Sequence, residues 1–224
     1  MQQYKNLIVI GTSHISIESI KTVREKILKI KPNIIALELD KRRFLSLMYS
    51  KKEKTKLSDI KKVGLSGFLF NILGAWAEKK LGKLVGVPPG SEMKEATKAA
   101  HEVKADIALI DQDITITLKK LSKRISFKEK SYFIYEILKG LFVKSPKLEF
   151  DLKKVPSPKV VKKMTDHVKK YYPSIYLTLI KERNEYMAKA LYKLITINPD
   201  KTILAVVGAG HEEEIIRLVK QCKA

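Results

Sequence analysis

The chain has 224 residues, of which 45% are hydrophobic and 31% are charged. This length and composition indicate a folded protein with a sizeable core, and they exclude a disordered chain. The net charge of +21 raises nucleic acid and anionic membranes as partners. Most of this charge comes from lysines spread along the chain, whereas base readout and phosphate clamps favour arginine. We therefore expect no specific nucleic-acid partner.

The sequence carries no signal for secretion or for a membrane span. Cys222 is the only cysteine, so no intramolecular disulfide can form and we expect a cytoplasmic location. The apolar run Leu7–Ile10 is too short for a signal peptide. The charge-free stretch from Val63 to Ala77 falls short of the ~18–20 apolar residues of a membrane-spanning helix. Two alternatives stay open, which are association with an anionic membrane surface and a place as the soluble part of a longer membrane protein.

The first forty residues predict a strand, a helix and a second strand. Leu7–Ile10 is apolar and β-branched, as in a buried parallel strand, and Gly11 ends it. Apolar residues at helical spacing then continue up to Pro32, and residues 33–37 form a second buried strand. A strand, a helix and a strand in succession make a right-handed unit with parallel strands. We therefore expect a parallel sheet.

The rest of the chain adds helices and further strands. The expected elements are a lysine-rich connection (51–62), an apolar segment interrupted by glycines (63–85), a helix (91–103), a strand (106–110), a mainly helical stretch (113–200, with a proline-containing break at 145–158), a strand (202–207) and a last helix. We expect an α/β fold in a single domain over 1–224. Helices cover a central, mainly parallel sheet of at least four strands, and 113–200 is a helical insertion before the last strand.

Polar side chains follow the predicted strands at the edge where parallel sheets bind ligands, beyond their carboxyl ends. Two histidines end matching Gly-x-x-His elements, His14 in GTSH and His211 in GAGH. Glu38 and Asp40 follow the second strand, and Asp111 follows the third. Because the carboxyl ends of parallel strands meet at one edge, we expect His14 and His211 to share one active site.

Structural roles are open for several of these groups. Glu38 and Asp40 could form a salt-bridged strand end with the neighbouring arginines, and Glu92 could be a first-turn acid that favours the helix dipole. Arg183, on an amphipathic helix, could form a structural ion pair or position an anionic or carbonyl group of a substrate. Two imidazoles and a carboxylate suit an open divalent metal site, but the composition does not decide whether a metal is bound.

Six segments resemble, in this order, the TraB family, which includes the pheromone-shutdown and Tiki proteins. They are IGTSHIS (10–16), ALELDKRR (36–43), PPGSEMKEA (88–96), LIDQDI (109–114), KERNEYMA (181–188) and VVGAGHEEEI (206–215). The segments extend over nearly the whole chain. The resemblance implies an archaeal-type TraB domain with a fold related to the erythromycin-esterase and ChaN-like α/β proteins.

The resemblance also implies a hydrolytic site, because Tiki proteins are metal-dependent proteases. The implied activity is that of a metal-dependent hydrolase, a peptidase, acting on a peptide or small-molecule substrate. The resemblance implies catalytic roles for five residues, which are His14, Glu38, Glu92, Arg183 and His211. A divalent metal (Mn, Co or Zn) would be held by His14, His211 and a glutamate, for which we take Glu92, with Glu38 as the other candidate.

The sequence departs from the family pattern at two positions. Asn184 stands where an aspartate is common in the Glu-Arg-Asp element, and Gln112 stands where an arginine is common after Asp111. These two departures concern the residues that surround the site. The histidines and glutamates of the site itself match the family pattern.

Two other functions compete with a metal-dependent peptidase. One is a metal-free, esterase-like hydrolase with His14 as general base and Glu38 as its partner. The other is a non-enzymatic protein that sequesters a peptide or an apolar ligand through residues 63–85. In addition, we expect a homodimer that covers this apolar segment, because a monomer would expose a large apolar patch.

Overall fold

The computed structural model describes residues 1–13, 16–49, 59–142 and 157–222, and in these residues five strands form one sheet. Their spatial order is β1-β2-β5-β3-β4. The strands are β1 (Gln2–Tyr4), β2 (Leu7–Thr12), β3 (Ile34–Leu37), β4 (Asp106–Leu109) and β5 (Ile203–Gly208). β1 is antiparallel to β2, and the other neighbours are parallel. The carboxyl ends of β2, β5, β3 and β4 therefore lie at one edge.

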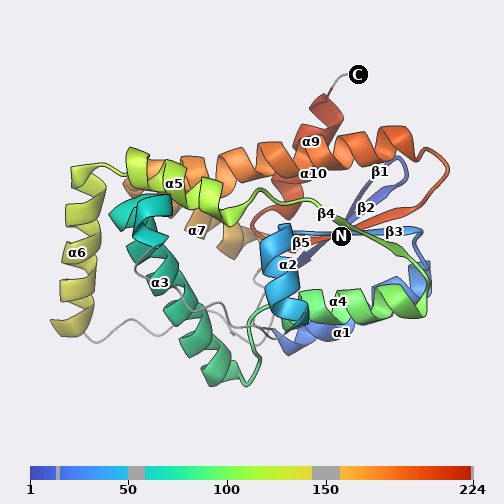
Figure 1. Ribbon diagram of the computed structural model, residues 1–224, viewed down its shortest axis with the longest axis horizontal. Helices are drawn as coiled ribbons and strands as arrows, with labels where there is room; N and C mark the ends of the chain where they lie inside the picture. The colour runs from blue at the N-terminus through green and yellow to red at the C-terminus, as the bar shows by residue number, and fades with distance from the viewer. Residues whose placement is uncertain (14–15, 50–58, 143–156, 223–224) are drawn as a thin grey trace.

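Helices cover both faces of the sheet and give a three-layer α/β arrangement (Figure 1). The helices of the two outer layers are α1 (Ile17–Ile30) and α4 (Ser91–Glu102) on one face, and α9 (Glu182–Ile197) and α10 (Glu212–Gln221) on the other. In β5, Leu204 and Val206 contribute to the core under α1 and α4. Ile203, Ala205 and Val207 contribute to the core under α9 and α10. This burial on both sides explains why the strand is a continuous apolar run.

Local capping sets where the helices next to the site begin. The Oγ atom of Ser16 accepts a hydrogen bond from the backbone N–H of Ser19 and starts α1. Asp40 caps α2 (Lys41–Met48) in the same way, because its carboxylate accepts a hydrogen bond of 2.9 Å from the N–H of Arg43. Asp40 thus has a structural role at the end of β3.

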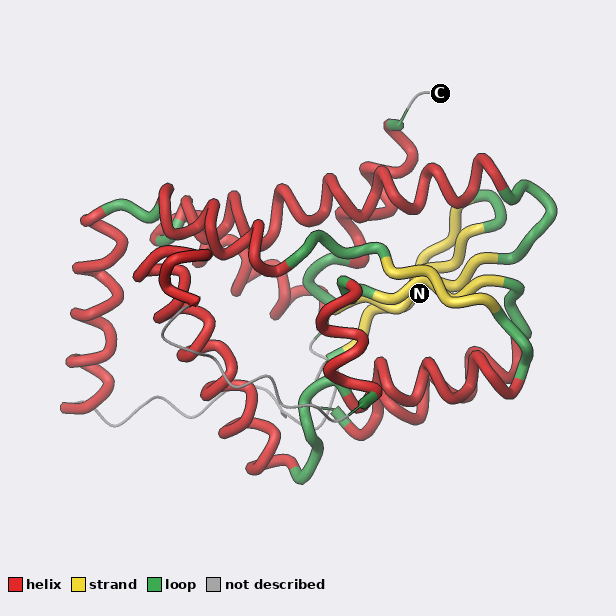
Figure 2. The backbone as a smooth tube through the Cα atoms, viewed as in Figure 1, coloured by secondary structure: helices red, strands yellow, loops and turns green. Residues whose placement is uncertain are grey.

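A second group of helices lies beyond the carboxyl edge of the strands (Figure 2). It consists of α3 (Asp59–Val85), α5 (Ile114–Arg124), α6 (Phe127–Phe142), α7 (Pro158–Tyr171), α8 (Pro173–Ile175) and η1 (Tyr176–Lys181). η1 is a π-helical segment that continues directly into α9. α3 is kinked at Gly64, where φ is 76°, and it packs against α5 through Val63, Phe68 and Leu118.

The expected α/β fold is confirmed, including the parallel sheet and the helical insertion between β4 and β5. The sequence did not predict β1 or α2, which are short, with three and eight residues. Much of the expected break at 145–158 and of the connection at 51–62 lies outside the described residues. Among the helices that the structure describes, none has the length and hydropathy needed to cross a bilayer.

Two glycines of α3 predict opposite effects on stability. A Cβ atom at Gly67 would lie 2.5 Å from the carbonyl oxygen of Leu118, whereas a Cβ at Gly74 would meet no atom within 4 Å. Gly67→Ala should therefore lower the free energy of unfolding by about 1–3 kcal/mol through overpacking. Gly74→Ala should raise it by about 0.5–1 kcal/mol, because alanine is the better helix former. Urea unfolding checks both values, and equal effects of the two substitutions would contradict the close packing of α3 on α5.

Candidate active site

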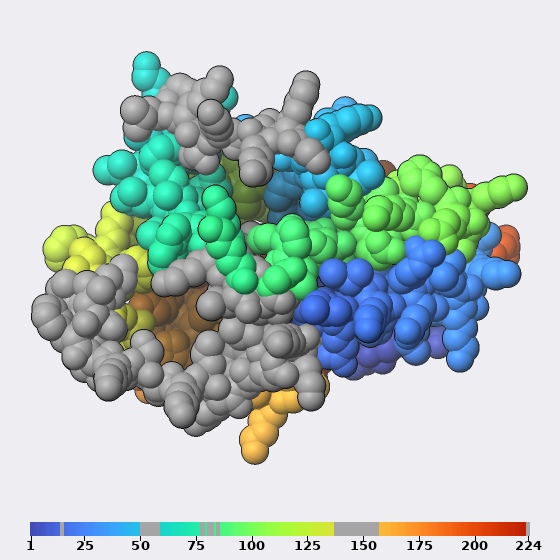
Figure 3. Space-filling model, turned by 90° about the horizontal axis from the view of Figure 1, so that it is seen from below, coloured from blue at the N-terminus to red at the C-terminus, as the bar shows by residue number. Residues whose placement is uncertain are grey.

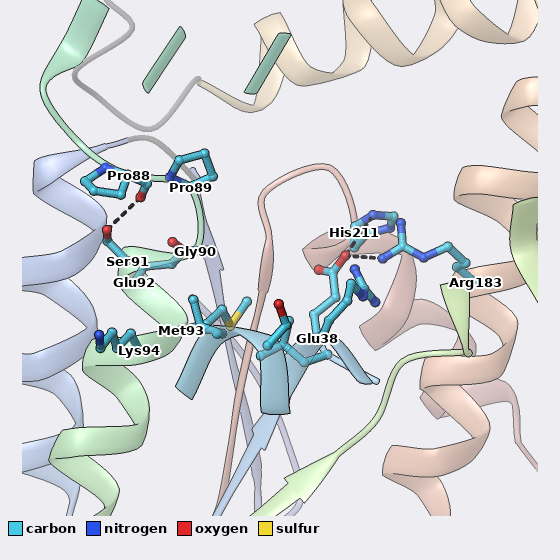
Figure 4. Close-up of a pocket in the computed structure, with 14 residues that line it drawn as sticks. Glu38, Pro88, Pro89, Gly90, Ser91, Glu92, Met93, Lys94, Arg183 and His211 are labelled. Atoms are coloured by element: carbon cyan, nitrogen blue, oxygen red, sulfur yellow. Dashed lines mark hydrogen bonds and ion pairs between the residues drawn. The ribbon is translucent and has the colours of Figure 1, made fainter. Parts of the chain in front are cut away.

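A pocket of about 780 Å³ lies at the carboxyl edge of the sheet. On one side it is lined by Glu38 after β3, by His211 after β5 and by Arg183 in the first turn of α9 (Figure 4). On the opposite side lie the turn between α3 and α4 and the first turn of α4, residues 88–94. Its walls thus come from four segments that are distant in the sequence.

Arg183 forms a buried ion-pair cluster with two carboxylates at this edge. One of its terminal nitrogens lies 2.6 Å from Oε1 of Glu38 and 2.6 Å from Oδ2 of Asp111. Its Nε atom donates to Oδ1 of Asp111 at 3.1 Å, and its other terminal nitrogen donates to the carbonyl oxygen of Leu179 at 3.2 Å. The side chains of Glu38, Asp111 and Arg183 are 3%, 0% and 14% exposed. Arg183 therefore uses its N–H donors in hydrogen bonds to other groups of the protein.

Burial by itself lowers the pKa of the Arg183 guanidinium, but attraction to Glu38 and hydrogen bonds to Asp111 outweigh it. The pKa of Arg183 is raised above its ordinary value as a result. Arg43 extends the cluster, because it pairs with Asp40 at 2.7 Å and also with Asp111. Its pKa is also raised, since Asp111 and Asp40 outweigh the effect of burial. Asp111 is thus held between two arginines.

His211 is placed by a short turn and two side chains. Its backbone N–H donates to the carbonyl oxygen of Gly208 at 2.8 Å, directly after β5. In the ring, Nδ1 lies 2.5 Å from Oδ1 of Asn184, and Nε2 lies 3.4 Å from Oε1 of Glu38. An amide oxygen only accepts hydrogen bonds, so Nδ1 carries the proton and the lone pair of the neutral ring is on Nε2.

Glu38 links the ion-pair cluster to the histidine. Its Oε2 atom accepts a hydrogen bond of 2.6 Å from the backbone N–H of Gly208, while Oε1 faces both Arg183 and His211. A single carboxylate thus ties the end of β3 to the end of β5 and to α9.

Four of the five predicted catalytic residues line the same pocket, namely Glu38, Glu92, Arg183 and His211. The fifth, His14, lies outside the described residues. Its strand is nevertheless placed, because β2 and β5 are parallel neighbours with Thr12 opposite Gly208. Both Gly-x-x-His elements therefore follow adjacent strands at the same edge. The catalytic roles stay predictions.

The structure also identifies partners that the sequence did not predict. Asn184 is buried and contacts His211, and Arg43 contacts Asp111. The sequence marked Asn184 only as a departure from the family pattern. Its contact depends on the rotation of α9 about its axis, which the order of residues alone does not reveal.

The described part of the chain contains no group of three or more His, Cys, Asp and Glu side chains arranged to hold a metal ion. Of the predicted ligands, His211 and Glu92 line the pocket, and His14 is not described. Nε2 of His211 and Oε1 of Glu38 lie 3.4 Å apart. Two tetrahedral ligands with bonds of about 2.1 Å have about this separation. Imidazole and carboxylate donors at this spacing fit a divalent ion, provided that a third ligand completes the site.

The sheet, the helical insertion and the charge cluster define an α/β domain with a pocket at its strand ends. The model of the TraB/PrgY/gumN family matches residues 2–224, and the chain belongs to this family. An uncharacterised protein of Methanocaldococcus jannaschii is 40% identical over 220 residues, which cover 96% of this chain and 54% of that protein. The TraB domain-containing protein of Mus musculus is 24% identical over 229 residues, 91% of this chain and 60% of that protein.

The chain thus spans little more than half the length of these relatives. Among solved structures, ChaN of Campylobacter jejuni, studied for cofacial heme binding, matches with a TM-score of 0.39 and 14% sequence identity. The match covers 97% of this chain and 76% of that chain.

Removal of the Arg183 guanidinium should strongly destabilise the fold. Arg183→Met leaves Glu38 and Asp111 buried without their shared cation, so we expect the free energy of unfolding to fall by about 3–5 kcal/mol. Arg217→Met is the matched control, because Arg217 is 53% exposed and pairs at the surface with Glu214 at 2.6 Å. Urea unfolding should show little change for this control. Equal losses in the two variants would rule out a special role of the buried cluster.

Asn184 should set the tautomer of the His211 ring. In Asn184→Leu the acceptor at Nδ1 is lost, so ¹⁵N NMR of metal-free protein should show a mixture of tautomers in place of one. Asn184→Asp keeps the acceptor, so a single tautomer with the proton on Nδ1 should remain. His101, exposed on α4, serves as the internal reference in the same spectra. Unchanged His211 signals in Asn184→Leu would contradict the contact.

Proposed function

We propose that this chain is a metal-dependent hydrolase, a peptidase of the TraB type, with its catalytic centre beside His211 and Glu38. The observation that carries the proposal is the placement of the His211 ring. Asn184 holds Nδ1, and Nε2 lies 3.4 Å from a buried carboxylate at the wall of a pocket. General bases and metal ligands both need an imidazole that is fixed in one tautomer in this way.

The residues that would hold a metal are His211, a glutamate and the predicted ligand His14. The spacing of Nε2 and Oε1 favours Glu38 as the carboxylate, with Glu92 on the opposite wall left to act as general base. When bound, a divalent ion would polarise the scissile carbonyl group and activate water. Family membership supports this choice of chemistry, because the matching segments contain each of these side chains.

Arg183 acts in this proposal as a positioning residue and does not bind the substrate. Its guanidinium already donates to Glu38, Asp111 and the carbonyl oxygen of Leu179. It therefore fixes the carboxylate that faces His211. Substrate contacts fall instead to the opposite wall, where Ser91 and Lys94 lie in the first turn of α4. A volume of about 780 Å³ is large enough for a short peptide segment.

Metal analysis of the purified protein tests the metal centre. Wild-type protein, loaded with Mn, Co or Zn and desalted, should retain close to one equivalent. His14→Ala/His211→Ala should retain none, and His101→Gln, which changes an exposed histidine of α4, should retain as much as the wild type. Metal retention equal in the wild type and the double variant would contradict the proposed ligands.

Hydrolysis of a defined peptide mixture, followed by mass spectrometry, tests the activity. We expect cleavage that a chelator abolishes and that added metal restores. His211→Ala and Glu38→Gln should each lower the rate by about 10²–10⁴-fold, the range of general acid–base catalysis. Folding of each variant is checked by circular dichroism. Cleavage that persists in chelator but is lost in Glu38→Gln would replace the proposal with the metal-free hydrolase.

A further inference from the structure

α3 carries an exposed apolar row in addition to the face that packs on α5. Leu65, Leu69, Ile72 and Trp76 are 60%, 49%, 40% and 58% exposed. Their spacing of four, three and four residues places them on one side of the helix. Lys79 and Lys83, also exposed, extend this line by three and then four residues. We call these six residues the α3 stripe.

Single exposed apolar residues are ordinary, but a continuous row on one helix indicates an interaction surface. α3 has 27 residues, yet no described helix is apolar and long enough to cross a bilayer. A helix whose exposed side combines leucine, isoleucine and tryptophan with lysine can lie in the interface of a bilayer with its axis along the surface. The composition of the stripe fits that position.

We propose that the α3 stripe docks on an anionic lipid surface. Leu65, Leu69 and Ile72 would enter the boundary between headgroups and acyl chains, and Lys79 and Lys83 would contact lipid phosphates. The chain carries a net charge of +21, so an anionic bilayer attracts it at long range. A second copy of the chain fits the same stripe less well, because two copies would meet with like charge.

The docked orientation would bring the candidate site close to the lipid. α3 ends at Val85, and Pro88, Pro89 and Gly90, which follow it, line the pocket. Both α3 and α4 are visible on the face of the molecule that Figure 3 shows. This pocket wall begins three residues after the end of α3. Docking through the stripe would therefore bring it close to the membrane surface.

Trp76 gives a direct test, because it is the only tryptophan of the chain and belongs to the stripe. The full chain is mixed with vesicles of phosphatidylcholine alone, or with vesicles in which about one third of the lipid is phosphatidylglycerol. Co-sedimentation measures the partition coefficient, and the emission maximum of Trp76 reports insertion. We expect binding and a shift of the emission to shorter wavelength with the anionic vesicles only, and weaker binding as salt is raised.

Two variants separate insertion of the stripe from plain attraction of a basic protein. Leu69→Gln/Ile72→Gln should lower the partition coefficient at least about tenfold, whereas Leu28→Gln/Ile197→Gln, at exposed apolar positions of α1 and α9, should leave it unchanged. Both double variants alter side chains at the surface, and circular dichroism verifies their folding.

Charge reversal in the stripe needs its own control. Lys79→Glu/Lys83→Glu should also lower the partition coefficient, and more strongly than Lys21→Glu/Lys29→Glu, which changes two exposed lysines of α1. The two variants have the same net charge. A difference between them therefore reports the location of the lysines.

Three results would overturn the proposal. The first is an absence of binding to the anionic vesicles, and the second is binding that Leu69→Gln/Ile72→Gln leaves unchanged. The third is a dimer in light scattering that dissociates in Leu69→Gln/Ile72→Gln while vesicles are not bound. That result would assign the stripe to a second copy of the chain.

Discussion

The guanidinium of Arg183 connects three parts of the chain that are far apart in sequence. Glu38 follows β3, Asp111 lies just after β4, and Arg183 is in the first turn of α9. Two carboxylates buried at one strand edge repel each other, and neither can be solvated there. The cation between them makes this arrangement possible. It also fixes the rotation of α9 relative to the sheet, and with it the contact of Asn184 with His211.

The same cluster explains how the two Gly-x-x-His elements relate to the sheet. Glu38 accepts a hydrogen bond from the N–H of Gly208, the last residue of β5, and the next turn delivers His211. The turn is therefore held from the side of β3 as well as by its own strand. β2, which precedes His14, is the neighbour of β5 on the opposite side. A rigid strand edge of this kind suits a site that must keep its groups aligned.

Much of this arrangement follows from the sequence, for physical reasons. Buried parallel strands are continuous apolar runs, so β2, β3 and β5 could be placed before the structure was known. Because their carboxyl ends share one edge, Glu38 and His211 could be expected to lie together. The contact between His211 and Asn184 could not, since it depends on how α9 is rotated. The short strand β1 has no apolar alternation, and its pairing with β2 became visible only in three dimensions.

Asn184 also gives chemical meaning to a departure from the family pattern. An aspartate next to an imidazole favours the charged ring, whereas an amide supplies an acceptor without a charge. The neutral ring keeps its lone pair on Nε2, which metal ligation and base catalysis both require. The amide thus supplies an acceptor for Nδ1 without placing a negative charge beside the ring.

The π-helical turn η1 sets a constraint on the length of the chain between Tyr176 and Arg183. A π turn contains one residue more than the corresponding α-helical turn. One residue rotates a helix by about 100°. If the segment lost that residue and became α-helical, the residues before it would be rotated by about 100° relative to Arg183 and Asn184. Insertions and deletions should therefore be tolerated in the loops of the helical insertion but not in Tyr176–Lys181, and relatives that share the Arg-Asn pair should share this count of residues.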